Sequence, residues 1–346
     1  MRPDFSIADV LHAYGLPGEV VDVAPIGRAW SNRVYRLTTS EGRYAVKQLL
    51  NPWRDPHWKD WLLEAAAFEL AAHRSGIAMP RPMLTTDGSV LADLPGERPS
   101  VPRREGVTVR VHEWADGEPC GDGPVSPEIA HRVGGDLARM HALDHHPGRA
   151  DVFPVHDQQT IDGWDELVGR VRTGDPVLAD RAADAAPVVR EVGELLRDAV
   201  TDFGGQPMSH GDVDQKNLII TAGGPVLCDW DVAAPWPARQ ELARTAMSLA
   251  VWQHRDVARA VVAGYRAAGG DPVDIGPTDL AIDLRISLDW LGLCLERVAG
   301  LRDDGDQRRA EAVTAVPRLL AELEPRVDRV LSVRSWLAGR SSDSRH

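Results

Sequence analysis

The chain has 346 residues, of which 43% are hydrophobic and 26% are charged, and its formal net charge is −13. This size and balance are typical of a globular protein with a large core and room for two lobes. The acidic charge argues against a nucleic-acid partner. No apolar run approaches the roughly 20 residues of a membrane helix, so we expect no membrane partner.

The three cysteines and the N-terminal segment indicate a reducing compartment. Cys120, Cys228 and Cys294 are odd in number, scattered and not in metal-ligand spacing. Residues 1–5 lack the apolar core of a signal peptide. We therefore expect a cytoplasmic protein without a disulfide framework.

The charges are unevenly distributed along the chain. Residues 1–112 carry 14 Lys and Arg against 13 Asp and Glu, so all the excess negative charge lies downstream. Two interpretations stay open for this acidic part: general solubility, or a lobe that attracts cations.

The first third of the chain predicts a small antiparallel sheet with one main helix. A short amphipathic helix with Ser6 as its N-cap comes first, and a second helix, rich in alanine and leucine, ends before Gly76 and Pro80. Alternating apolar residues between turns predict the strands. The helices are expected at 6–14 and 62–74, and the strands at 20–23, 33–39, 43–49, 83–94 and 107–114.

The remainder is predicted to be mainly helical. Ser126 and Pro127 form a favourable helix start, and later segments have good amphipathic patterns. Helices are expected at 126–143, 162–172, 178–184, 186–203, 278–300 and 307–333, and within 240–268. The predicted fold class is therefore α+β.

Residues 210–231 interrupt the helices with a polar motif and a hairpin. The loop His-Gly-Asp-Val-Asp-Gln-Lys-Asn leads into an apolar run, a Gly-Gly turn, and a second apolar run that ends in Asp-Trp-Asp. The hairpin would bring Asp212, Asn217 and Asp229 to one end. Oxygen ligands of this kind suit Mg²⁺, which takes one or two protein carboxylates and completes its shell with phosphates and water.

This segment resembles the catalytic and metal-binding loops of the aminoglycoside phosphotransferase family, within the protein-kinase-like superfamily. The family pattern is His-Gly-Asp, four residues and Asn, followed by an apolar residue, Asp, Trp and an acid, and both parts are matched here. The resemblance implies a two-lobed protein-kinase-like fold. Residues 1–112 would form the sheet-containing N-lobe, 113–118 a hinge, and 119–346 the helical C-lobe.

The resemblance also implies roles for individual residues. Asp212 would be the catalytic base, and Asn217 and Asp229 would hold Mg²⁺. Lys47, which follows Tyr-Ala-Val on the third strand, would bind the α- and β-phosphates. Glu64 is expected to form the ion pair with Lys47, with Glu69 on the same helix as the alternative.

The nucleotide is expected to lie between the loop at 27–32 and the hinge. Ser31 and Asn32 are the candidate contacts in the loop, and the Glu113 carbonyl and the Ala115 amide are those in the hinge. ATP is the implied phosphate donor, and GTP stays open as an alternative because hinge contacts through the backbone constrain the base weakly.

The acceptor is expected to be a hydroxylated small molecule, with an aminoglycoside or another cationic antibiotic preferred. Asp231, Asp283, Asp289 and Trp290 are the candidate acceptor-binding residues, although each also fits a solvated or packing position. A primary-metabolite kinase, acting on an amino sugar, homoserine or choline, and a nucleotide-binding scaffold without turnover stay open, as do monomer and homodimer. Glu241 stands where the family has an Asp that braces the catalytic loop.

Overall fold

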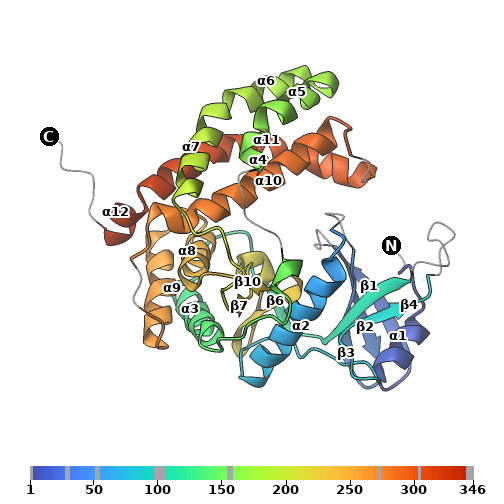
Figure 1. Ribbon diagram of the computed structural model, residues 1–346. Coiled ribbons are helices and arrows are strands. Elements are labelled where there is room, and N and C mark those ends of the chain that lie inside the picture. The colour runs from blue at the N-terminus through green and yellow to red at the C-terminus, as the bar shows by residue number, and fades with distance from the viewer. Residues whose placement is uncertain are drawn as a thin grey trace. The chain divides into compact units, whose positions relative to one another are not determined.

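The computed structural model describes residues 3–27, 32–50, 55–96, 106–153, 159–271, 274–302 and 305–339. These residues form two compact units, shown with the chain coloured by residue number in Figure 1. Unit 1 comprises 1–122, 139–153 and 207–235, and unit 2 comprises 123–138, 154–206 and 236–346.

Unit 1 is built on a five-stranded antiparallel sheet in the order β1-β2-β3-β5-β4. The alternation of apolar and polar residues predicts most of it, and a turn closed by the Thr39 amide on the Gly42 carbonyl at 2.8 Å joins β2 to β3. Of the predicted strand 83–94, only its last residues form one. The strands are β1 (Val20–Ile26), β2 (Arg33–Thr39), β3 (Arg43–Gln48), β4 (Ala92–Leu94) and β5 (Val107–Glu113).

One face of this sheet carries the apolar core of the N-terminal region. Val46 of β3 and Val109 and Val111 of β5 are completely buried there. Helix α1 (Ile7–Tyr14) covers this face, and the Tyr14 hydroxyl donates to the Val109 carbonyl at 2.9 Å. The intervening residues of β3 and β5 therefore face the opposite side, which positions the site described below.

Unit 1 also contains helix α2 (Trp58–Arg74) and the second hairpin. Helix α2 begins one turn before the predicted start at residue 62. Strands β8 (Leu218–Thr221) and β9 (Gly224–Leu227) form the predicted hairpin, and β6 (Gly117–Pro119), which the sequence pattern did not predict, pairs with β8. A small ladder joins β7 (Met208–Ser209) to β10 (Ala234–Pro235).

Unit 2 is helical over the part of it that the structure describes. Two helices fill the predicted segment 240–268, and the chain between them passes through Val251 and Trp252, which both have positive φ. Its helices are most of α3 (Pro127–His141), α4 (Gln159–Asp162), α5 (Trp164–Gly174), α6 (Pro176–Asp184), α7 (Ala186–Arg197), α8 (Ala238–Leu249), α9 (Arg255–Ala267), α10 (Ala281–Val298), α11 (Asp306–Leu331) and α12 (Val333–Ala338).

The structure confirms the α+β class, with an antiparallel sheet toward the N-terminus and helices toward the C-terminus. The predicted hinge at 113–118 lies near the end of the first segment of unit 1, but that unit also takes in 207–235. In the described ranges, no helix has the length and apolar character needed to cross a membrane.

Candidate functional site

The open end of the β8–β9 hairpin carries both predicted metal ligands. The last strand pair is Leu218 with Leu227, and beyond it the Cys228 amide donates to the Asn217 carbonyl at 2.8 Å. Asn217 and Asp229 therefore leave the two strands at the same end of the hairpin.

Asn217 is fixed in one orientation by Asp212. The Asn217 amide nitrogen donates to the Asp212 carbonyl at 2.8 Å and to Asp212 Oδ2 at 3.0 Å. Because both amide hydrogens are used, the amide oxygen remains as an acceptor, and it has no hydrogen-bond partner among the described residues.

This donor set fits Mg²⁺ rather than a metal whose ligands must all come from the protein. Asn217 supplies an amide oxygen and Asp229 a carboxylate whose side chain is 41% exposed. No group of three or more His, Cys, Asp or Glu in the described ranges is arranged to hold a metal. A hard cation with one or two protein ligands, completed by phosphate and water, matches these residues.

Asp212 is presented by a sharp loop that follows β7. Gly211 adopts φ 75°, in the left-handed region that favours glycine. The Lys216 ammonium lies 2.9 Å from Asp212 Oδ2, and the Asp212 side chain is 15% exposed. His210 Nε2 donates to the Cys228 carbonyl at 2.9 Å while its Nδ1 accepts from the Asp212 amide at 3.3 Å, so the neutral His210 ring ties the loop to the hairpin.

Asp229 stands out by its backbone conformation. It has φ 66° and ψ 53°, a left-handed conformation that is uncommon outside glycine and is often found at functional sites. The next residue, Trp230, is buried, donates from its indole to the Leu227 carbonyl at 3.0 Å, and packs against Phe68 and His210. The indole therefore anchors the turn that exposes Asp229.

Two basic residues lie opposite each other on the sheet face away from the apolar core. The register pairs Lys47 of β3 with Arg110 of β5, and Ala45 with His112. The Arg110 side chain is 1% exposed and that of Lys47 is 13% exposed. Two cations on a buried face require anionic partners.

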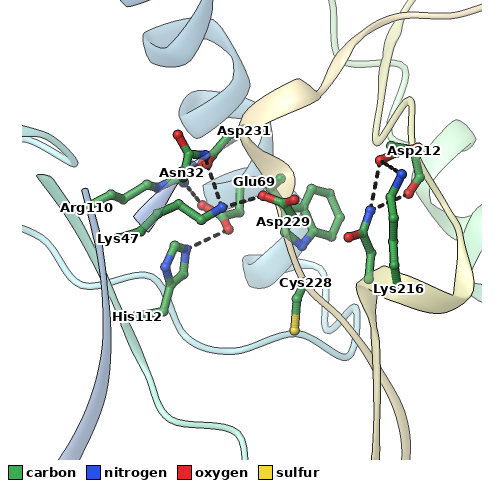
Figure 2. A network of polar contacts seen from close by, with 12 residues as sticks. Asn32, Lys47, Glu69, Arg110, His112, Asp212, Lys216, Cys228, Asp229 and Asp231 are labelled. Carbon is green, nitrogen blue, oxygen red and sulfur yellow. Dashed lines mark hydrogen bonds and ion pairs between the residues drawn. The ribbon is translucent and has the colours of Figure 1, made fainter. Parts of the chain in front are cut away.

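These partners come from α2 and from the segment after β9, as Figure 2 shows. Lys47 Nζ pairs with the Asp229 carboxylate and lies 2.6 Å from Asp231 Oδ2. Arg110 Nη1 lies 2.8 Å from Asp231 Oδ1, and Arg110 Nη2 pairs with Glu69. We call Lys47, Glu69, Arg110, His112, Asp229 and Asp231 the buried charge cluster.

The cluster shifts the pKa values of its members. Burial alone would lower the pKa of Lys47, but the Asp229 and Asp231 carboxylates outweigh it and hold that pKa above its ordinary value. Burial would raise the pKa of Asp231, and the charges of Lys47 and Arg110 reverse this, so the pKa lies far below the usual range. Burial, reinforced by Arg110 and Lys47, lowers the pKa of His112 well below 6.5.

The expected ion pair between Glu64 and Lys47 is corrected by the structure. Glu64 accepts a hydrogen bond from the Gly148 amide at 2.8 Å, and the ion pairs of Lys47 go to Asp229 and Asp231. The buried carboxylate of α2 is Glu69, which pairs with Arg110 instead. Glu69 of α2 is therefore linked to Lys47 indirectly, through Arg110 and Asp231.

Three of the four predicted nucleotide contacts lie in the described part of the chain, and all four stay predictions. Asn32 Nδ2 donates to Asp231 Oδ2 at 3.3 Å, whereas Ser31 lies outside the described residues. At the hinge, Glu113 ends β5, and its carboxylate pairs with Arg81. Ala115 lies in the irregular stretch between β5 and β6, so both hinge contacts stay predictions.

The predicted acceptor residues are already paired with arginines of the protein. Asp231 is buried in the charge cluster, which corrects its assignment to the acceptor. In unit 2, Asp283 lies 2.9 Å from Arg244, Asp289 lies 3.0 Å from Arg285, and the Arg297 guanidinium stands over the Trp290 ring at 5.7 Å. Both carboxylates therefore already have an arginine partner, and a cation already stands over the Trp290 ring.

Sequence reasoning missed Arg110 and His112 and preferred the wrong glutamate. The signals were present: Val107, Val109 and Val111 alternate with polar residues on β5, and two of those polar residues are Arg110 and His112. A buried strand that carries charge on alternate positions predicts a polar site on that face.

Together, these residues can support phosphoryl transfer. Such a reaction needs a carboxylate that orients a hydroxyl, oxygen ligands for a divalent cation and a cation for the phosphates, with little covalent chemistry from the protein. Asp212, Asn217, Asp229 and Lys47 are of the required types.

The comparisons with known proteins point the same way. The sequence model described as the phosphotransferase enzyme family matches residues 22–281. No curated protein matches the chain in sequence.

Several solved structures share the fold. A spectinomycin phosphotransferase in complex with ADP and spectinomycin is 14% identical, with a TM-score of 0.68, over 93% of this chain and 97% of the other. A microcompartment-associated aminopropanol kinase is 16% identical, with a TM-score of 0.64, over 93% and 97%. An amicoumacin kinase with AMP-PNP and Ca²⁺ is 15% identical, with a TM-score of 0.62, over 92% of each chain. These likenesses confirm the kinase-like fold that the sequence predicts.

Proposed function

This chain belongs to the phosphotransferase enzyme family, and from that premise we propose that it transfers the γ-phosphate of ATP to a hydroxyl of a small molecule. The observation that carries the proposal is the open end of the β8–β9 hairpin. There Asn217 is bonded to Asp212, and Asp229 is bonded to Lys47. The backbone hydrogen bond from the Cys228 amide to the Asn217 carbonyl holds the two pairs at the same end of the hairpin.

In the proposed reaction, Asp212 orients the acceptor hydroxyl and accepts its proton. The acceptor oxygen forms the new bond to the γ-phosphorus as the bond to the β-phosphate oxygen breaks, and ADP leaves. Asn217 and Asp229 would hold Mg²⁺, which when bound offsets the negative charge of the phosphates. Lys47 would exchange its carboxylate partners for the phosphates.

We propose an aminoglycoside or another cationic antibiotic as the first candidate acceptor. The acidic charge of the chain supports it, as do the spectinomycin and amicoumacin enzymes among the similar folds. The pairing of Asp283 with Arg244 and of Asp289 with Arg285 favours a second candidate, a less cationic primary metabolite. The aminopropanol kinase among the similar folds supports this second candidate.

A panel of hydroxylated antibiotics and metabolites, followed by coupled detection of ADP, tests the proposal. Wild-type protein should release ADP only with its acceptor, and Asp212→Asn should slow turnover by about 100-fold or more, because the variant cannot accept the hydroxyl proton. Turnover by Asp212→Asn at the wild-type rate would refute the assigned base. Nucleotide binding without turnover on any acceptor would instead favour the scaffold alternative.

A further inference from the structure

Arg110 joins three segments of unit 1 from a fully buried position. It extends from β5 to Glu69 of α2 and to Asp231 after β9, and its side chain is 1% exposed. A planar guanidinium suits this bridging position because its fixed fork of donors can hold two carboxylates at once. Figure 2 shows Arg110 and Lys47 next to each other, both extending toward Asp231.

The two oxygens of Asp231 are held by different cations. Lys47 Nζ lies 2.6 Å from Oδ2, and Arg110 Nη1 lies 2.8 Å from Oδ1. If Lys47 turns to a nucleotide phosphate, Asp231 keeps one cationic partner. If Arg110 is absent, Lys47 is the remaining cation beside a buried carboxylate, and its departure becomes strongly unfavourable.

We propose that Arg110 is a positioning residue that neutralises Asp231 and thereby allows Lys47 to engage the nucleotide. The inference rests on the proposed function, since it concerns the lysine that would bind phosphate. Arg110 itself is too deeply buried to touch the nucleotide and acts only through Asp231. Loss of Arg110 should therefore weaken nucleotide binding more than it slows the chemical step.

Two double variants with the same net charge test this role. Arg110→Met with Glu69→Gln removes the arginine and one acid but leaves Asp231 dependent on Lys47. Arg110→Met with Asp231→Asn removes the arginine together with the carboxylate that it neutralises. Folding is checked by circular dichroism, and the Kd of ADP with Mg²⁺ is measured by calorimetry.

The first double variant should bind the nucleotide at least about tenfold more weakly than the second, a difference that corresponds to about 1.4 kcal/mol. Its KM for ATP should rise while its kcat changes less. A purely structural role predicts equal Kd values in the two variants, and that result would overturn the inference.

Arg110→Lys provides the test if the first double variant does not fold. A lysine lacks the planar fork of donors with which Arg110 holds Glu69 and Asp231, so the Kd should rise, and an unchanged Kd would overturn the inference. Wild-type protein is measured first. Absence of nucleotide binding in the wild type would count against the proposed function. If the wild type binds but the two double variants have equal Kd values, the result would count only against the role proposed for Arg110.

Discussion

His112 stands among charged side chains while its own ring is neutral at pH 7. Its Nε2 lies 3.0 Å from Glu69 Oε1, and burial and the nearby cations lower its pKa well below 6.5. The charged groups around it, from three elements and the segment after β9, are Glu69, Arg110, Lys47, Asp229 and Asp231.

This arrangement predicts a loss of stability below pH 6.5. The unfolded chain protonates His112 more readily there than the folded chain does, so acid favours unfolding, by at most about 1.4 kcal/mol at pH 5.5 relative to pH 7.5. His112→Gln keeps a donor for Glu69 and removes the titration, so the free energy of unfolding of this variant, measured in urea, should fall less between the two pH values than that of the wild type. An equal fall in both proteins would show that His112 is charged in the folded state.

The sequence pattern around Glu64 and Glu69 could have identified the buried glutamate of α2, but not its partner. Family resemblance favoured Glu64, but Glu69 continues the stripe of Leu62, Ala65 and Ala72, which are all buried on one side of α2. An acid in an apolar stripe predicts a buried partner. Its identity was not predictable, because Arg110 lies far away in sequence and meets the helix only after the sheet has formed.

At the scale of elements, α3 and α9 of unit 2 touch through glycines. A Cβ at Gly264 would lie 1.8 Å from the His131 carbonyl, and one at Gly134 would lie 2.1 Å from the Val261 carbonyl. Both obstacles are backbone atoms, so the helices would have to move apart to admit a methyl group.

Gly264→Ala should therefore destabilise the protein by roughly 1–3 kcal/mol, the usual cost of overpacking. Gly169→Ala is the matched control, because this exposed glycine of α5 has nothing within 4 Å of a Cβ. It should stabilise the helix by about 0.5–1 kcal/mol. Thermal unfolding of both variants measures the difference, and similar melting temperatures would contradict the close helix contact.

The hairpin that carries the proposed metal ligands was predictable because its signals are local. Two apolar runs flank Gly223 and Gly224, and the strands formed where they were expected. Strand β6, which pairs with β8, was missed because its Gly-Glu-Pro sequence has no strand propensity and its pairing is decided by tertiary contact.

At the scale of the whole molecule, nucleotide binding should be visible as added stability. ADP with Mg²⁺ at about 100 times its Kd should contribute about 2.7 kcal/mol and raise the melting temperature by a few degrees. EDTA should remove most of the shift, since Asn217 and Asp229 are proposed to act through the metal. Asp229→Asn should lose the metal-dependent part, and an identical shift with and without EDTA would contradict the assigned ligands.

The buried charge cluster also limits which substitutions related proteins can tolerate at its positions. Exchange of Glu69, Arg110 or Asp231 alone breaks a buried ion pair. The break costs about 3–5 kcal/mol, a large fraction of the stability of a typical domain. Single exchanges at positions 69, 110 and 231 are therefore expected to be eliminated, while paired exchanges that remove an acid and a base together survive. In descendants of this chain, these positions should change as a set or not at all.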